Sequence, residues 1–133
     1  MMAKSFRLEK NNSDDIGFAS TCLVAGIIDF DEFKAWLYFV MENSDEIPSY
    51  FFNILDINEK FEYTLKRQEV VGFTPSWEGT TFEENALYGI GYKRNIAYQN
   101  DVVSQISALK ALSKNPHIEE RFKETFPFLE LPE

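Results

Sequence analysis

Hydrophobic positions along this chain recur mainly at the spacing of an α-helix, in which every third or fourth residue faces the same side. The clearest case follows Asp29, where Phe33, Leu37 and Val40 fall on one face. Asp29 and Glu32 stand three positions apart, as in the capping box that begins many helices. The pattern predicts a helix that begins at Asp29 and buries these three apolar side chains.

Weaker versions of the same pattern predict three more helices in the first half of the chain. Each has a cap, a proline or a glycine at an end, where such residues are common. The expected helices are residues 14–25, with Ser13 as N-cap and Gly26 as the stop; a short segment after Pro48 that includes Tyr50, Phe51, Ile54 and Leu55; and residues 59–71, with Asn58 as cap, Phe61, Leu65 and Val71 as the apolar stripe, and Gly72 as the stop.

Residues 72–81 contain two glycines and one proline within ten positions, so we expect a loop there. Two pairs then have the spacing of a capping box, namely Thr80 with Glu83 and Thr81 with Glu84. Either pair would begin the next helix.

The stretch after this cap is ambiguous. Gly89 and Gly91 lower the helix propensity by about 1 kcal/mol each, and every second residue around them is apolar, as in a strand. Two interpretations therefore stay open for residues 87–92: a helix through Leu87 and Ile90, or a strand through Tyr88, Ile90 and Tyr92.

Two more helices are expected near the end, and helical spacing outnumbers alternation in the chain as a whole. The expected fold is therefore all-α, a single compact multi-helix domain over residues 1–133 whose residues 1–12 form a flexible or loosely packed N-terminus; a small α+β domain is the alternative. The last two helices contain Val102, Val103, Ile106, Leu109 and Leu112, and then, after Asn115 and Pro116, Ile118, Phe122 and Phe126.

Composition narrows the class of protein. Of 133 residues, 44% are hydrophobic, which is enough for a core and too apolar for a disordered chain. A net charge of −9 repels phosphate groups, so we expect neither direct nucleic-acid binding nor an anionic membrane surface. A cationic partner is favoured. No apolar stretch has the roughly 20 residues of a membrane helix, and the first residues lack the apolar core of a signal peptide.

Candidate chemistry is sparse. The one cysteine, Cys22, has no partner for an internal disulfide and is expected in the core, while the one histidine, His117, is expected at the surface. The segment after Gly26 is similar to the end of a calcium-binding EF-hand loop, but Leu23 and Ala25 stand where oxygen ligands are required. We therefore expect a cytoplasmic protein that is not an enzyme and binds no metal or cofactor.

Acidic residues concentrate in two tracts. Eight acids and one lysine lie between Asp29 and Glu59, and four acids and no base lie between Glu69 and Tyr92. Acidic residues are also common at helix starts and on solvated faces. Any single acid in these tracts is therefore explained equally well without a partner. Trp77, in the loop between the helices of these tracts, suits an interface anchor or a lid over the core. The residues expected to meet a partner are Glu42, Asp45, Glu46, Tyr50, Trp77, Glu78, Glu83 and Glu84.

The aromatic-rich run from Phe18 to Val40, continuing through Glu42, Asn43 and Pro48 to Tyr50, resembles small bacterial immunity proteins of contact-dependent growth inhibition and related polymorphic toxin systems. The resemblance covers residues 14–57 in general style and carries no residue over by position. It implies a cytoplasmic protein that binds one cognate toxin domain, often a nuclease, and neutralises it by covering its active or substrate-binding surface.

Charge and resemblance lead to one main hypothesis. The chain is expected to be a monomer that forms a 1:1 complex with a basic toxin domain, an RNase in the simplest case, because a nuclease presents Lys and Arg to its substrate and an acidic face steers the two together. The alternative is a regulatory or adaptor domain that binds a peptide helix in a Phe-rich groove.

Overall fold

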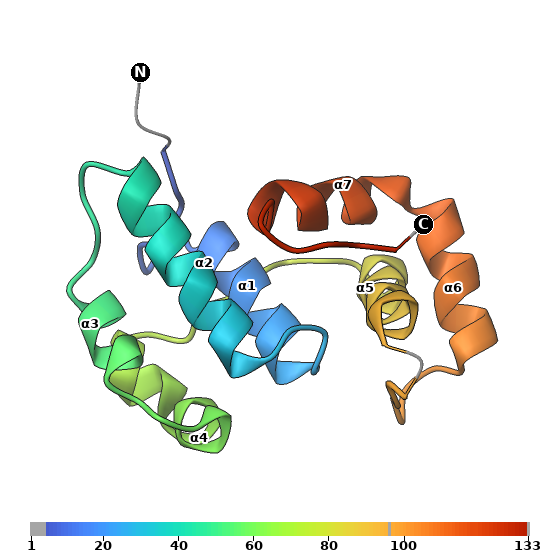
Figure 1. Cartoon of the computed structure of the whole chain (residues 1–133), viewed down its shortest axis with the longest axis horizontal. Helices are drawn as coiled ribbons and strands as arrows, with labels where there is room; N and C mark the ends of the chain where they lie inside the picture. Colours follow the sequence, from blue (N-terminus) through green and yellow to red (C-terminus); the bar gives the residue numbers. More distant parts are fainter. Residues whose placement is uncertain (1–4, 96, 133) are drawn as a thin grey trace. The chain divides into compact units, whose positions relative to one another are not determined.

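The computed structural model describes residues 5–95 and 97–132. The chain is 61% helical, with seven helices and no strand or sheet among the described residues (Figure 1). The all-α fold class predicted from the spacing of apolar residues is therefore confirmed.

The chain divides into two compact units. The single domain expected over residues 1–133 stays a prediction. The first unit, residues 5–24 and 29–77, contains α1 (Asp14–Val24), α2 (Phe30–Asn43), α3 (Tyr50–Leu55) and α4 (Lys60–Val71); the second unit, residues 25–28 and 78–132, contains α5 (Thr81–Arg94), α6 (Gln105–Lys114) and α7 (Pro116–Thr125).

Helix α2 begins as its sequence predicted. The Glu32 amide donates to the Asp29 carboxylate at 2.7 Å, and the Asp29 amide donates to the Glu32 carboxylate at 2.9 Å, which completes the capping box. Phe33, Leu37 and Val40 are all fully buried. The local cap and the predicted buried face are both confirmed.

An aromatic cluster fills the first unit. The ring centre of Phe33 lies 5.2 Å from that of Tyr63 and 6.0 Å from that of Trp36, and Trp36 lies 6.2 Å from Phe51. The hydroxyls of Tyr63 and Ser20 share a hydrogen bond of 3.1 Å, so the buried phenol keeps a partner. Burial raises the pKa of Tyr63 to about 12, and the phenol stays neutral at physiological pH.

The apolar stripe expected for α4 is mostly wrong. Phe61 and Leu65 are 70% and 67% exposed, whereas Val71 is buried as expected and Tyr63 is buried in place of the other two. Tyr63 packs against Phe30 and Phe33 of α2, so α2 selects the tyrosine face. The backbone of Lys66 departs from helical angles and bends α4 near its middle, which breaks the regular spacing on which the expectation depended.

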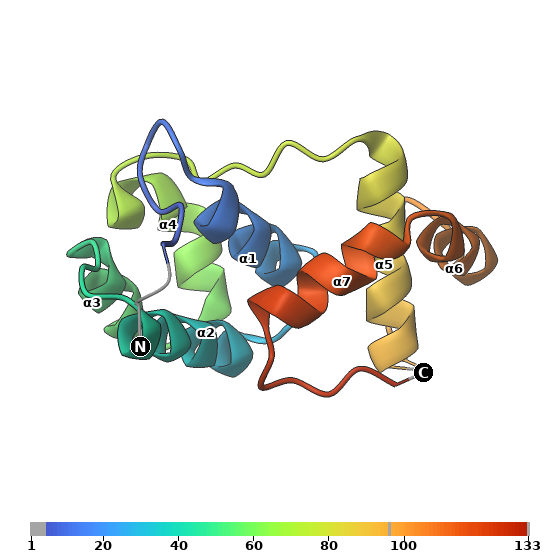
Figure 2. The ribbon, with the colours of Figure 1, turned by 90° about the horizontal axis from the view of Figure 1, so that it is seen from above.

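Residues 87–92 belong to helix α5, so the strand interpretation is wrong. Of the two possible caps, Thr80 with Glu83 forms, through hydrogen bonds of 3.0 and 3.1 Å. At Gly89, a Cβ atom would lie 2.5 Å from the Ala108 carbonyl oxygen of α6. The glycine that weakens the isolated helix thus permits close packing of α5 against α6, which lie next to each other in both views (Figures 1 and 2).

Helix α6 is shorter than expected. Val102 and Val103 precede it, because their amides donate to the Asn100 side chain at 2.7 and 3.1 Å and so form a turn. Ile106, expected in the core, is 81% exposed, and the helix buries Ala108 and Leu112. Helix α7 begins at Pro116 as predicted and buries Ile118 and Phe122, and Phe126 just after it is buried as well.

The loop between α1 and α2 packs within the second unit. The Tyr98 hydroxyl donates to the Ala25 carbonyl at 2.8 Å, and Arg94 donates to the Ile27 carbonyl at 2.5 Å. Gly26 adopts φ +77°, a left-handed conformation that favours glycine, and it ends α1 as the sequence predicted.

The flexible or loosely packed N-terminus expected for residues 1–12 stays a prediction, and within residues 5–12 one side chain is buried while most are exposed. Leu8 is only 4% exposed, and Glu9 and Asn12 exchange backbone hydrogen bonds of 2.9 and 3.1 Å. The guanidinium of Arg7 pairs with the Asp15 carboxylate at 2.7 Å, which joins this segment to the start of α1. Residues 1–4, the rest of that expectation, lie outside the described residues.

Candidate functional site

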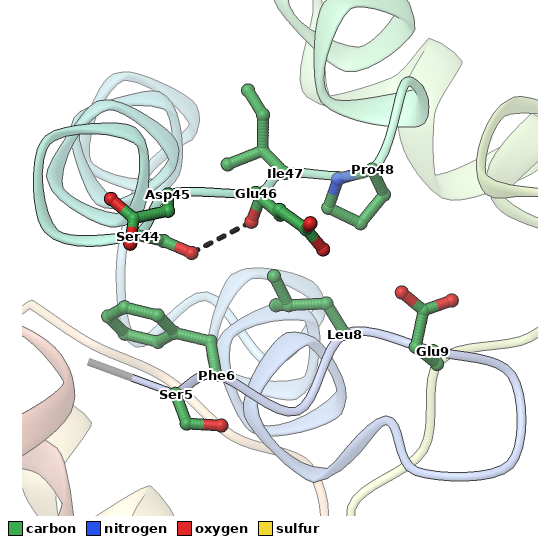
Figure 3. Close-up of a pocket in the computed structure, with 9 residues that line it drawn as sticks. All are labelled: Ser5, Phe6, Leu8, Glu9, Ser44, Asp45, Glu46, Ile47 and Pro48. Atoms are coloured by element: carbon green, nitrogen blue, oxygen red, sulfur yellow. Dashed lines mark hydrogen bonds between the residues drawn. The ribbon is translucent and has the colours of Figure 1, made fainter. Parts of the chain in front are cut away.

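Two segments of the first unit, far apart in sequence, face each other across an open hollow of about 410 Å³ (Figure 3). One segment precedes α1 and the other joins α2 to α3. We call this hollow the acidic groove, because three of its residues carry carboxylates. Its lining residues are Ser5, Phe6, Leu8, Glu9, Ser44, Asp45, Glu46, Ile47 and Pro48.

Buried contacts fix both walls of the acidic groove. The Tyr50 hydroxyl donates to the Leu8 carbonyl at 2.7 Å, and the ring of Phe6 meets that of Phe39 edge-on at 6.3 Å. On the opposite wall, the Ser44 hydroxyl donates to the Glu46 carbonyl at 2.7 Å and shapes the turn after α2. The groove is therefore held by packing and hydrogen bonds from both sides.

The structure places Tyr50, one of the residues expected to meet a partner, inside the first unit. Its side chain packs under the wall formed by residues 5–9, and the residue is 7% exposed. Burial, and then the negative charge of Glu9, raise the pKa of the Tyr50 hydroxyl, which keeps the proton that it donates to Leu8. Tyr50 supports the groove and does not line it.

The carboxylates of Glu9, Asp45 and Glu46 have no hydrogen-bond or ion-pair partner among the described side chains. The neighbouring cation Arg7 is committed to Asp14 and Asp15 instead. In Figure 3, the Glu46 carboxylate extends over the middle of the groove and Glu9 rises from the opposite wall, whereas Asp45 points toward its other end. Three carboxylates that have no partner among the described side chains therefore surround the hollow.

The described His, Cys, Asp and Glu side chains include no group of three close enough to hold a metal ion. Glu9, Asp45 and Glu46 thus stand too far apart to share one ion.

The other expected acids lie outside the acidic groove. Glu42 is exposed in the last turn of α2, and Glu78 and Glu84 of the second unit are exposed as well. Glu83 caps α5 and meets His117 at 2.6 Å. The hydrogen bond from the Thr80 backbone, and then that from His117, lower the pKa of Glu83, so this carboxylate is already engaged.

Trp77 folds back onto the first unit. Its ring meets that of Phe18 edge-on at 5.2 Å, and Gly17 lets the backbone of Ser76 approach α1 closely. The Ser76 amide donates to the Ser13 hydroxyl at 3.2 Å, which secures the same loop. Of the two roles considered for Trp77, the geometry fits the lid; part of its surface stays accessible.

A second hollow, of about 440 Å³, lies in the second unit. We call it the leucine hollow. Its only described acid, Glu119, pairs with Lys93 at 2.6 Å, so the charges on its rim neutralise each other. It is lined by Lys93, Leu109, Leu112, Ser113, Pro116 and Glu119.

Cys22 is fully buried and His117 is exposed, as the sequence predicted. Within residues 5–95 and 97–132, none of the helices combines the length and the apolar character that crossing a membrane requires.

Sequence reasoning named Asp45 and Glu46 but missed Glu9, the third carboxylate of the groove. Glu9 follows a segment of mixed polar and apolar residues near the N-terminus and has no motif around it. It reaches the groove because the Tyr50 hydroxyl holds the Leu8 carbonyl and the Leu8 side chain is buried.

Comparisons with protein-family models, with curated proteins and with solved structures find no match to this chain.

Proposed function

We propose that this chain is an immunity protein that binds a cognate basic toxin domain, an RNase in the simplest case, and neutralises it by covering the active or substrate-binding surface. It acts in the cytoplasm as a monomer, by binding alone, and forms a 1:1 complex. The observation that carries this proposal is the acidic groove, where three carboxylates lack local partners.

Charge supports the same role. Residues 1–24 and 29–77 hold 13 acidic and 7 basic residues, so the first unit is the more acidic one. A nuclease must expose cationic side chains to bind phosphates, and uncompensated carboxylates attract them over a distance of about 10 Å at 0.1 M salt. The acidic groove thus offers both attraction and a defined place of contact.

The proposal is tested with the toxin domain encoded next to this chain's gene. Cells that express the toxin are expected to grow only when the chain is co-expressed, and the two proteins are expected to co-purify at a 1:1 ratio. The double variant Asp45→Asn/Glu46→Gln should protect less well, whereas Glu62→Gln, an exposed acid on α4, should protect fully. Growth arrest despite a folded, abundant wild-type chain would refute the proposal.

The leucine hollow favours a second candidate function, an adaptor that binds a peptide helix. Ile106 is 81% exposed beside it on α6, and Leu109 lines it at 36% exposure. These are leucine and isoleucine positions, not the Phe-rich groove that the sequence suggested. Loss of a partner on Leu109→Asp substitution, with Glu46→Gln tolerated, would favour this function over the first.

A further inference from the structure

Helix α6 carries an exposed apolar strip on the flank that its own unit leaves open. Helices α5 and α7 lie on the same side of α6 in both views (Figures 1 and 2), and α6 buries Ala108 and Leu112. Ile106 is 81% exposed and Leu109 is 36% exposed, and their spacing of three places them on one flank. Leu109 also lines the leucine hollow, so the strip leads into the hollow.

Two lysines border this strip, and we call them the lysine pair. Lys110 lies about one helical turn after Ile106, and Lys114 lies about one turn after Lys110. Both lysines are exposed, and neither has an ion-pair partner among the described side chains. Between Asp101 and Glu119 the sequence contains no acid, although the net charge of the chain is −9. An acidic protein therefore gives this apolar surface a positive border.

The lysine pair determines which occupant the strip favours. A second copy that presented the same face of α6 would bring the lysine pairs of both copies together, and like charges repel. A partner helix with apolar residues at positions i, i+3 or i+4, and i+7 can cover such a strip and enter the hollow. Carboxylates on the flank of that helix would meet the lysine pair. The rim of the hollow adds no charge preference of its own, because Lys93 pairs with Glu119 at 2.6 Å.

We propose that the strip and the leucine hollow bind an acidic amphipathic helix of a partner protein. Its apolar side chains lie over Ile106 and Leu109, and its carboxylates meet the lysine pair. The inference goes beyond toxin binding, because it uses the second unit and a partner of the opposite charge. It rests on the adaptor candidate, to which it adds the charge of the peptide and the role of the two lysines.

The experiment is an NMR titration of the whole chain with a synthetic peptide of about 15 residues, which has leucines at helical spacing and glutamates beside them. One control peptide has glutamine at every glutamate position. A second control has the acidic composition in a scrambled order, so that its leucines do not share a face. The acidic peptide is expected to cause saturable amide shifts in residues 105–117. The glutamine peptide should bind about fivefold more weakly, and the scrambled peptide should cause no shifts there.

Variants assign the contacts. Ile106→Gln changes an exposed residue, so the fold should stay intact while peptide binding weakens about tenfold. Lys110→Gln/Lys114→Gln should weaken binding of the acidic peptide about two- to tenfold and leave binding of the glutamine peptide unchanged. Lys10→Gln/Lys66→Gln, which removes two exposed charges from the first unit, is the matched control and should bind as wild type does. Unchanged amide spectra away from α6 check the fold of each variant.

Each contrary result has its own meaning. Equal affinity for the glutamine peptide would overturn the inference and leave the adaptor candidate standing, whereas shifts from neither helical peptide, or shifts confined to other surfaces, would overturn both. Sedimentation of the chain alone is expected to show a monomer. A dimer that Ile106→Gln abolishes would overturn the inference, since a second copy would then cover the strip. Growth protection judges toxin neutralisation separately, because neither the strip nor the lysine pair belongs to the acidic groove.

Discussion

The acidic groove and the leucine hollow are similar in volume, about 410 and 440 Å³, but their charges are arranged differently. In the groove, Glu9, Asp45 and Glu46 lack described partners; in the hollow, Lys93 and Glu119 satisfy each other at 2.6 Å. The difference shows that volume alone does not indicate a ligand. The groove attracts cations from a distance, whereas the hollow can stabilise only what buries apolar surface within it.

The units that hold these two sites are also stabilised differently. The first unit depends on an aromatic cluster around Phe33, and the second on the close approach of two helices at Gly89. The first arrangement loses stability when volume is removed, and the second when volume is added. Substitutions of opposite kind therefore test the two units.

The largest effect is expected from removing volume in the first unit. Leu37 is fully buried on α2, so Leu37→Ala should lower the free energy of unfolding by about 2 to 5 kcal/mol. Leu65→Ala, the same change at a 67% exposed position, is the control and should stay within about 0.5 kcal/mol. Urea denaturation followed by circular dichroism measures both, and equal losses would show that the buried face of α2 is wrongly placed.

Adding volume should harm the second unit. In Gly89→Ala the new methyl group meets the Ala108 carbonyl of α6, and we expect a net loss of about 1 to 3 kcal/mol despite the better helix propensity of alanine. Asn85→Ala on the same helix supplies the propensity gain without this clash. Thermal denaturation compares the two; a stabilised Gly89→Ala protein would contradict the close packing of α5 against α6.

The contrast between the two sites should appear in association kinetics. Asp45→Asn/Glu46→Gln is expected to slow association with the cognate toxin severalfold and to flatten its dependence on salt, because uncompensated charge steers the encounter. Glu119→Gln, which removes a charge already paired with Lys93, should change the association rate less. Stopped-flow measurements at several salt concentrations test this. A larger effect from Glu119→Gln would show that the leucine hollow, and not the acidic groove, steers the encounter.

The smallest effect concerns the cap of α5. The hydrogen bonds from Thr80 and His117 lower the pKa of Glu83, so the ionised carboxylate stabilises the folded state above the ordinary pKa of 4.5, and that contribution is lost as the pH falls through the lowered folded-state value. Glu83→Gln should therefore be slightly less stable than wild type at pH 7 and equal to it at pH 2.5. Denaturation curves at the two pH values test this. The prediction is contradicted if the difference in unfolding free energy between variant and wild type is larger at pH 2.5 than at pH 7.

The sequence predicted best those features that depend on a few adjacent residues. Asp29 and Glu32 lie within one helical turn, so the spacing indicates the cap of α2. For α5 the spacing narrows the cap to two neighbouring pairs, of which Thr80 with Glu83 forms. The outward face of α4 was missed, because the choice between Tyr63 and Leu65 depends on α2, which lies some thirty residues earlier.

The candidate site was only partly accessible to sequence reasoning for the same reason. Asp45 and Glu46 stand out as acids in a loop, but Glu9 joins them through the distant contact between Tyr50 and Leu8. Gly89 was interpreted as a weakness of a helix, because propensity describes one segment and cannot include Ala108 of another.

The loop between α1 and α2 has a consequence for how such a gene could be recombined. Trp77 ends the first unit, yet a cross-over there would separate Ala25 and Ile27 from Tyr98 and Arg94, the side chains that hold their carbonyls. A chimera that takes its first 77 residues from another gene would need a loop that fits these two donors. Exchange of residues 29–77 alone leaves the loop with its own partners, but the new segment would have to fit Leu8, Ser13 and Ser20, which form hydrogen bonds with Tyr50, Ser76 and Tyr63.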